Sequence, residues 1–123
     1  MDYQKAVKRY IPMSETMFYI LLSLLVPKHG YGIMQQVKDI TRGRIILGAG
    51  TIYQSIGKLD GDGLIASVRE EDRKKIYQIT DTGKRILLIE ANRIKELYHN
   101  VEGALPAFDH DYCSLLNGKL QPS

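Results

Sequence analysis

The sequence has 123 residues, which is enough for one compact domain with a single hydrophobic core. Hydrophobic residues make up 44% and charged residues 25% of the chain. This globular composition excludes a disordered tail protein, a collagen-like chain and a disulfide scaffold. The net charge of +3 permits an acidic partner such as nucleic acid without requiring one.

Cysteine usage and the N-terminal residues indicate a reducing compartment. The single cysteine, Cys113, has no partner for an internal disulfide, and residues 1–5 lack the apolar core of a secretory signal. The longest apolar run, residues 18–26, is about half of the roughly 20 residues needed to cross a bilayer. We therefore expect a cytoplasmic protein without a membrane partner.

The first part of the chain predicts three consecutive elements. Residues 1–12 can form a short amphipathic helix, which we treat as an N-terminal extension. Residues 13–27 are apolar almost all round and predict a buried helix, with Ser14 at its start. After a break, apolar residues spaced by four and three predict a helix over residues 31–41.

A third helix is predicted over residues 51–61. A short β-branched segment and the sequence Gly48-Ala49-Gly50 precede it, which predicts a turn that needs backbone freedom, with Thr51 as the helix N-cap. The apolar residues at spacings of four and three give an inward face, made of Ile52, Ile56 and Leu59. The outward face carries small, polar and basic groups, namely Thr51, Gln54, Ser55 and Lys58.

Two apolar segments around a charged loop predict a β-hairpin. The segments are residues 64–68 and 76–79, and the loop is residues 69–75. Three acids precede three cations in this loop, so its charge nearly cancels and only the arm after Asp72 is cationic. The cations are Arg73, Lys74 and Lys75.

The last predicted helix covers residues 81–102, and residues 103–123 are predicted to form a loose tail. Five residues of the helix step by four and three, as in a coiled-coil seam, and they are Leu87, Ala91, Ile94, Tyr98 and Val101. Alone, this stripe fits an intramolecular core as well as a dimer seam. The all-round apolar helix over 13–27 favours the dimer, because a small domain cannot easily cover both surfaces.

The order helix, helix, helix, hairpin, long helix predicts a mostly α fold with a two-stranded β-hairpin. We interpret residues 1–80 as a winged helix-turn-helix domain and residues 81–102 as a C-terminal dimerisation helix. In this fold the third helix enters the major groove of DNA, where hydroxyl, amide and ammonium groups bind base edges and phosphates. Cations of the wing can neutralise the phosphate backbone.

Four short strings resemble the PadR family of bacterial transcriptional regulators. They are HGYGI at 29–33, LGAGTIY at 47–53, LDGDGLI at 59–65 and YQITDTG at 77–83. The resemblance implies a homodimeric winged helix, usually a repressor, whose C-terminal helix supplies the dimer contacts. A single long helix after the wing is similar to the family's smaller subgroup, which includes regulators of multidrug transporters that respond to flat hydrophobic compounds.

The resemblance also implies DNA-binding roles for Tyr31, Thr51, Tyr53, Lys58, Arg73, Lys74 and Lys75. Gln54 joins this set because it lies on the outward face of the third helix, where its amide can bind base edges. The chain departs from the family pattern at Ala49, where proline is common, and it contains no tryptophan, although some drug-binding members stack ligands between tryptophans. Gly57 lies inside the third helix at a cost of roughly 1 kcal/mol relative to alanine. It either lets the backbone approach DNA or is a tolerated weakness.

We predict no catalytic residue, no cofactor and no metal. The sequence has no phosphate-binding loop with a lysine and no nucleophile elbow, and the spacing within residues 109–113 fits no standard zinc pattern. The predicted function is a ligand-responsive homodimeric repressor that reads a pseudo-palindromic operator, with a small hydrophobic or aromatic effector. The alternative is a winged-helix protein-interaction module without DNA affinity, which the acids near the wing favour.

Overall fold

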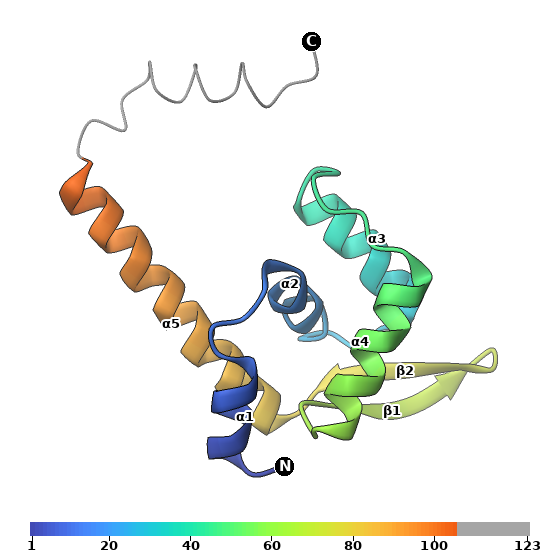
Figure 1. Ribbon diagram of the computed structural model, residues 1–123. Helices are drawn as coiled ribbons and strands as arrows, with labels where there is room; N and C mark the ends of the chain where they lie inside the picture. Colours follow the sequence, from blue (N-terminus) through green and yellow to red (C-terminus); the bar gives the residue numbers. More distant parts are fainter. Residues whose placement is uncertain (106–123) are drawn as a thin grey trace. The chain divides into compact units, whose positions relative to one another are not determined.

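The computed structural model describes residues 1–105 (Figure 1). The elements in chain order are α1 (Tyr3–Tyr10), α2 (Glu15–Ser23), α3 (Gly30–Ile40), α4 (Ala49–Gly61), β1 (Ile65–Glu71), β2 (Lys74–Ile79) and α5 (Asp81–Ala104). The predicted fold class, mostly helical with a two-stranded hairpin, is confirmed. Residues 1–90 form one compact unit, and a second unit begins at Ala91 within α5.

Helix α2 begins where the sequence predicts and ends earlier. The Ser14 side chain accepts a hydrogen bond from the backbone N of Met17 at 3.1 Å, as expected for an N-cap. The helix stops at Ser23 rather than near residue 27, because the residues before Pro27 are disfavoured in helical conformation. Leu25 and Val26 are consequently exposed, by 45% and 63%, instead of lying in a buried helix.

The prediction for the start of α4 was wrong by two residues. Gly48 is the N-cap and Ala49 is the first helical residue, so Thr51 lies inside the first turn and does not cap the helix. A turn with unusual backbone conformation was expected near Gly50. The left-handed conformation instead occurs earlier in the chain, at Arg42 and Gly43, whose φ values are 53° and 78°. The chain therefore turns directly after α3, and residues 45–48, which lead into α4, form neither helix nor strand.

The hairpin is longer and its turn tighter than predicted. Antiparallel pairing continues to Glu71 and Lys74, so most of the expected loop over residues 69–75 is strand. Opposite charges face each other across the ladder, Glu71 opposite Lys74 and Glu70 opposite Lys75, an arrangement that stabilises strand pairing. Only Asp72 and Arg73 form the turn, both at positive φ, as in a type I′ hairpin turn.

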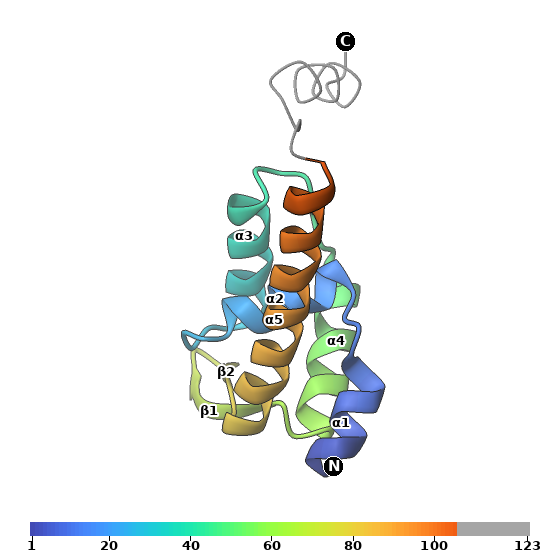
Figure 2. The same cartoon turned by 90° about the vertical axis from the view of Figure 1, so that its left-hand side faces the viewer.

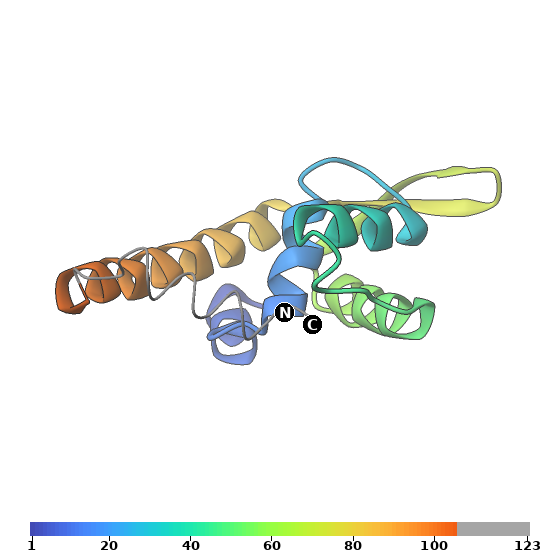
Figure 3. The same cartoon turned by 90° about the horizontal axis from the view of Figure 1, so that it is seen from above.

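The wing, residues 65–79, is attached to the segment that leads into α3. The backbone N of Lys28 donates to the carbonyl O of Tyr77 at 3.1 Å, and the N of Tyr77 donates back to Lys28 at 3.0 Å. Figure 3 shows the hairpin extending past the adjacent ends of α3 and α4. The start of α3 and the wing are thus joined through backbone atoms.

The first turn of α5 packs tightly against the segment that follows α4. Thr80 caps the helix, since its Oγ1 accepts from the N of Gly83 at 3.1 Å and donates to the carbonyl O of Gly63 at 2.7 Å. A β-carbon on Gly83 would lie 2.1 Å from the Leu64 carbonyl O, so only glycine fits there. The helix ends at Ala104, just beyond the predicted end.

The core of the first unit lies between the helices and the base of the hairpin. Its fully buried side chains come from all five helices and from β1, and they include Ala6, Ile20, Ile33, Ile52, Ile65 and Ile86. None of the helices in residues 1–105 has an apolar stretch long enough to cross a membrane.

Candidate nucleic-acid interface

Helix α4 presents the two faces that the sequence predicts. Ile52, Ile56 and Leu59 are buried, with at most 3% of their surface exposed, whereas Thr51, Gln54 and Lys58 are exposed. The positions opposite the buried face form what we call the crest of α4, made of Gly50, Gln54, Gly57 and Gly61. A β-carbon at any of the three glycines would meet nothing within 4 Å, so the fold itself does not require glycine there.

A shallow open hollow brings the wing, α3 and α4 together. It has a volume of about 200 Å³, and its lining consists of His29, Gly30, Tyr53, Arg73, Lys74, Lys75 and Tyr77. Four of the residues predicted to bind DNA, Tyr53 and the three wing cations, therefore converge from two separate elements. Within residues 1–105 none of these cations forms an ion pair, although two of them face acids across the ladder.

Tyr53 is held at this hollow by its contact with the start of α3. A β-carbon on Gly30 would lie 3.1 Å from the Tyr53 Cζ atom and 3.2 Å from its hydroxyl oxygen. The Tyr53 side chain is still 60% exposed, so the hydroxyl can reach a ligand. Tyr31 does not line the hollow, but it lies beside it, 62% exposed, with its ring stacked on His29 at 6.2 Å between centroids.

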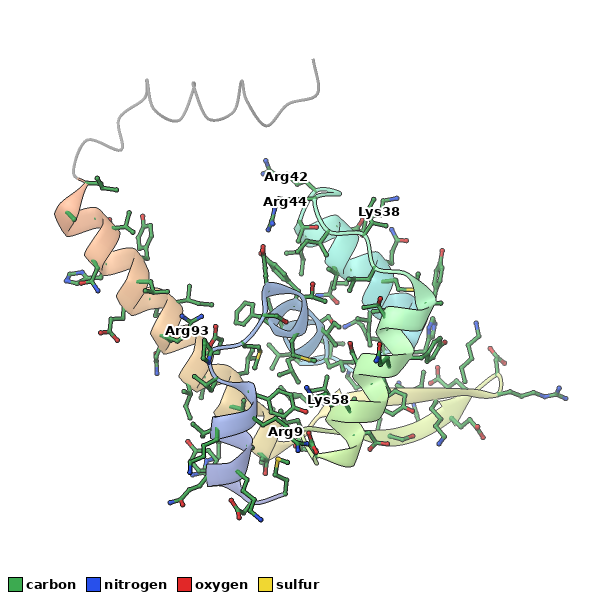
Figure 4. The ribbon with its side chains drawn as sticks, viewed as in Figure 1. Arg9, Lys38, Arg42, Arg44, Lys58 and Arg93 are labelled. Atoms are coloured by element: carbon green, nitrogen blue, oxygen red, sulfur yellow. The ribbon has the colours of Figure 1, made fainter. Side chains whose placement is uncertain are left out.

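Lys58 is the predicted DNA-binding residue that lies apart from the hollow. Its Nζ lies 5.2 Å from the centroid of the Tyr10 ring, so the side chain points toward α1 (Figure 4). The Asp62 carboxylate lies close enough to interact with this ammonium, and the Lys58 charge helps to lower the pKa of Asp62. The aromatic ring and the acid explain why this cation turns toward α1.

Sequence reasoning missed the cluster around Asp62. Arg9 Nη1 donates to both carboxylate oxygens of Asp62, at 2.9 and 3.0 Å, and the Tyr10 hydroxyl donates to Oδ2 at 2.5 Å. The hydrogen bond from Tyr10 is the main reason that the pKa of Asp62 lies below its ordinary value, followed by Arg9. No local spacing could reveal this cluster, because Arg9 and Asp62 are 53 positions apart.

The basic residues at the other end of α3 were also not predicted as a group. Lys38, Arg42 and Arg44 are exposed and carry their charges near the turn after α3 (Figure 4). Arg44 forms an ion pair with Glu15 of α2, which lowers the pKa of that carboxyl. This pair is exposed on both sides, so it contributes little to stability.

Comparison with known proteins decides the family. The model of the transcriptional regulator PadR-like family matches residues 17–88, which is more than half of the chain. The chain belongs to the PadR-like family. The match begins in α2 and ends in α5, so it includes α3, α4 and the wing and leaves α1 outside.

Solved structures agree with this PadR assignment. A PadR family transcriptional regulator from Eggerthella lenta has a TM-score of 0.63 and 24% identity, covering 86% of this chain and 89% of that one. TubR of Bacillus thuringiensis, solved bound to 24 bp of tubC, has a TM-score of 0.57 and 15% identity, covering 76% of this chain and 96% of TubR. At such identities the likeness establishes a shared fold.

One curated relative is much longer than this PadR-like chain. An uncharacterized 37.1 kDa protein in transposon TN4556 of Streptomyces fradiae is 30% identical over 81 residues. The aligned region is 65% of this chain and 23% of that protein. The chain therefore spans less than a quarter of the length of this relative.

In this PadR-like chain the predicted seam residues of α5 become more exposed toward the end of the helix. Leu87 is 7% exposed and belongs to the core of residues 1–90, so intramolecular packing accounts for it. Ala91 is half-buried, and the later seam residues are exposed, Ile94 by 39%, Tyr98 by 63% and Val101 by 38%. The run at 109–113 that contains metal-ligand types lies outside the described residues, and residues 1–105 hold no cluster suited to a metal ion.

Proposed function

We propose that the protein is a homodimeric transcriptional repressor that binds double-stranded DNA through α4 and the wing. The observation that carries this proposal is the convergence of Tyr53 with three exposed wing cations at the hollow beside α4. Cations beside an exposed helix are groups that can bind the phosphates flanking a major groove while the helix contacts base edges. TubR, which shares the fold, was solved bound to DNA.

Each predicted residue has a distinct role in this proposal. Thr51 and Gln54 lie on the exposed side of α4, where a hydroxyl and an amide can read base edges. Near the start of α3, the hydroxyls of Tyr31 and Tyr53 donate to phosphates of the DNA backbone. The wing cations, Arg73, Lys74 and Lys75, neutralise phosphates and release counterions. Lys58 is the weakest member, because its ammonium lies toward α1.

The second part of the proposal is that two copies pair through α5. Ala91, Ile94, Tyr98 and Val101 form the seam, which continues the coiled-coil spacing beyond the intramolecular contact at Leu87. A two-fold dimer would place the two α4 helices about one helical turn of DNA apart, so the operator would be pseudo-palindromic. In this arrangement residues 1–80 bind DNA, and α5 supplies the dimer contacts from Ala91 onward.

Control by an effector completes the proposal. The resemblance to the smaller PadR subgroup supports a flat hydrophobic compound bound between the long helices of the two copies. Such a compound would favour a separation of the α4 helices that no longer matches the operator, which is a population shift between two dimer states. The exposed apolar side chains of Ile94, Leu97 and Tyr98 would supply its contacts.

A DNA titration tests the central claim. Fluorescence anisotropy with labelled duplexes at several salt concentrations would be measured for the wild type, Lys74→Ala and Gln54→Ala. Lys74→Ala should weaken binding to all duplexes and reduce the slope of log K against log salt by about one. Gln54→Ala should instead change the preference among duplexes and leave the salt slope unchanged.

The matched control is Lys84→Ala, which removes an exposed lysine of α5 away from the hollow and should change neither property. Folded wild-type protein that shows no salt-dependent retention on duplex DNA would contradict the proposal. That result would favour the alternative, a winged-helix module that binds a protein through its charged hairpin.

A further inference from the structure

The end of α4 is tied to α1 by a compact set of hydrogen bonds. Asp62 is the C-cap of α4, only 9% exposed, and its carboxylate accepts two bonds from Arg9 and one from Tyr10. Tyr10 is itself 4% exposed, so its hydroxyl is shielded from water and depends on Asp62 as a hydrogen-bond partner. Figure 2 shows α1 beside this end of α4. We call Arg9, Tyr10 and Asp62 the α1 clamp.

The charge of Asp62 explains why the clamp is needed. The C-terminal end of a helix carries partial negative charge from its unpaired carbonyl groups, so a carboxylate there is electrostatically unfavourable. Asp62 occupies this position after α4, and the Arg9 guanidinium and Tyr10 hydroxyl compensate its charge. Without them the last turn of α4 would keep a poorly compensated, largely buried acid.

One side of the α1 clamp lies within the region that matches the family model, and the other side lies outside it. Asp62 and α4 lie within the matched residues 17–88, whereas Arg9 and Tyr10 precede them. The N-terminal helix is therefore an addition to the matched region that contacts the end of the helix proposed to read DNA. The Tyr10 ring also lies 5.2 Å from the Lys58 ammonium and keeps this cation of α4 near α1.

We propose that α1 is a positioning element for DNA recognition, in which Arg9 and Tyr10 hold the end of α4 through Asp62 and keep Lys58 beside α1. This inference rests on the proposed function. When the α1 clamp holds α4, the helix enters the major groove of DNA at one angle, which favours the correct base contacts. A released α4 would tilt, and a released Lys58 would add a cation that binds any phosphate, so discrimination between DNA sequences would fall.

The test uses conservative variants of the full chain. Tyr10→Phe removes only the hydroxyl, and Asp62→Asn removes the charge while retaining the shape. Tyr3→Phe is the matched control on the same helix, because the Tyr3 ring contacts Arg85 at 4.1 Å and this contact needs no hydroxyl. Each variant would be titrated with a duplex selected from a randomised pool by the wild type, and with a generic duplex.

We expect Tyr10→Phe and Asp62→Asn each to lower the ratio of selected to generic affinity by roughly fivefold, which is the order of the net contribution of one ordinary hydrogen bond. Tyr3→Phe should retain the wild-type ratio. Hydrogen exchange should become faster in residues 58–63 of the two clamp variants only. Because the groups act as one unit, the double variant should be no worse than either single variant.

The outcomes separate the inference from the proposed function. If folded Tyr10→Phe and Asp62→Asn keep the wild-type affinity ratio, the positioning role is overturned while DNA binding stands. If the wild type shows no salt-dependent DNA binding, the proposed function fails and this inference fails with it. Should Tyr10→Phe or Asp62→Asn not fold, Arg9→Gln at a half-exposed side chain provides the same comparison.

Discussion

The ring of Tyr53 lies directly over Gly30, so that a β-carbon at position 30 would be 3.1 Å from the Tyr53 Cζ atom. This contact joins the first residue of α3 to the middle of α4 and fixes the direction of the Tyr53 hydroxyl. A larger residue before Tyr31 would require the Tyr53 ring to shift from this position. The position of Tyr53 at the hollow therefore depends on the absence of a side chain on another helix.

We expect Gly30→Ala to displace the Tyr53 ring and to weaken DNA binding by roughly fivefold, about 1 kcal/mol. The free energy of unfolding should change by less than about 1 kcal/mol, because the ring is the mobile end of an exposed side chain and can move aside. Anisotropy titration and urea denaturation measure the two effects. Gly103→Ala, which adds a methyl group to α5 rather than to α3 or α4, should leave DNA affinity unchanged.

Gly57→Ala decides between the two interpretations of the glycine in the middle of α4. Alanine should raise the free energy of unfolding by about 1 kcal/mol, because the position is helical, exposed and open. If the crest of α4 lies against DNA, the same change should lower DNA affinity. Gly103→Ala in α5 is the control that adds a methyl group to a different helix. Unchanged affinity for Gly57→Ala would show that this glycine is merely tolerated.

The proposed dimer seam predicts that glutamate substitutions at two exposed residues of α5 affect dimer formation differently. Tyr98→Glu places a charge in the seam and should convert the dimer into monomers, because an unpaired buried charge is strongly unfavourable. Leu88→Glu changes a residue that is about as exposed as Tyr98, 61% against 63%, but lies outside the seam spacing. This variant should remain dimeric. Light scattering after size exclusion would measure both masses. A wild-type monomer, or a dimer that survives Tyr98→Glu, would place the pairing surface elsewhere.

The α1 clamp also predicts a dependence of stability on pH. The hydrogen bond from Tyr10, and then the contacts with Arg9, hold the pKa of Asp62 below its ordinary value of 3.8. The stabilisation is therefore fully present above pH 3.8 and is lost as the pH falls through the lower folded-state pKa. Urea denaturation across acidic pH should show this loss in the wild type. Asp62→Asn, which cannot titrate at this position, should lack that component.

The sequence predicted those features that depend on neighbours along the chain. Burial of Ile52, Ile56 and Leu59 follows from their helical spacing, and the N-cap at Ser14 follows from its residue type before an apolar helix. The start of α4 was harder, because Gly48 and Gly50 are typical of turns, yet the structure uses one as an N-cap and the other as a helical residue. Glycine permits both conformations, so composition alone could not decide.

Features that depend on distant residues could not be predicted. The acids and cations of the hairpin resemble a solvated loop until strand pairing places Glu71 opposite Lys74. Arg9 and Asp62 lie 53 positions apart, and no periodic pattern links them. The direction of Lys58 likewise depends on Tyr10 of another helix. Residue types thus indicated the proposed DNA-binding surface, whereas the direction of Lys58 depends on the packing of α1.

The bridge between Lys28 and Tyr77 consists entirely of main-chain atoms. Because the side chains take no part in this bridge, the substitution that would break it directly is proline, which removes one of the two donating N–H groups. The wing therefore has a second attachment to the fold, besides its own two chain connections, at the segment that leads into α3.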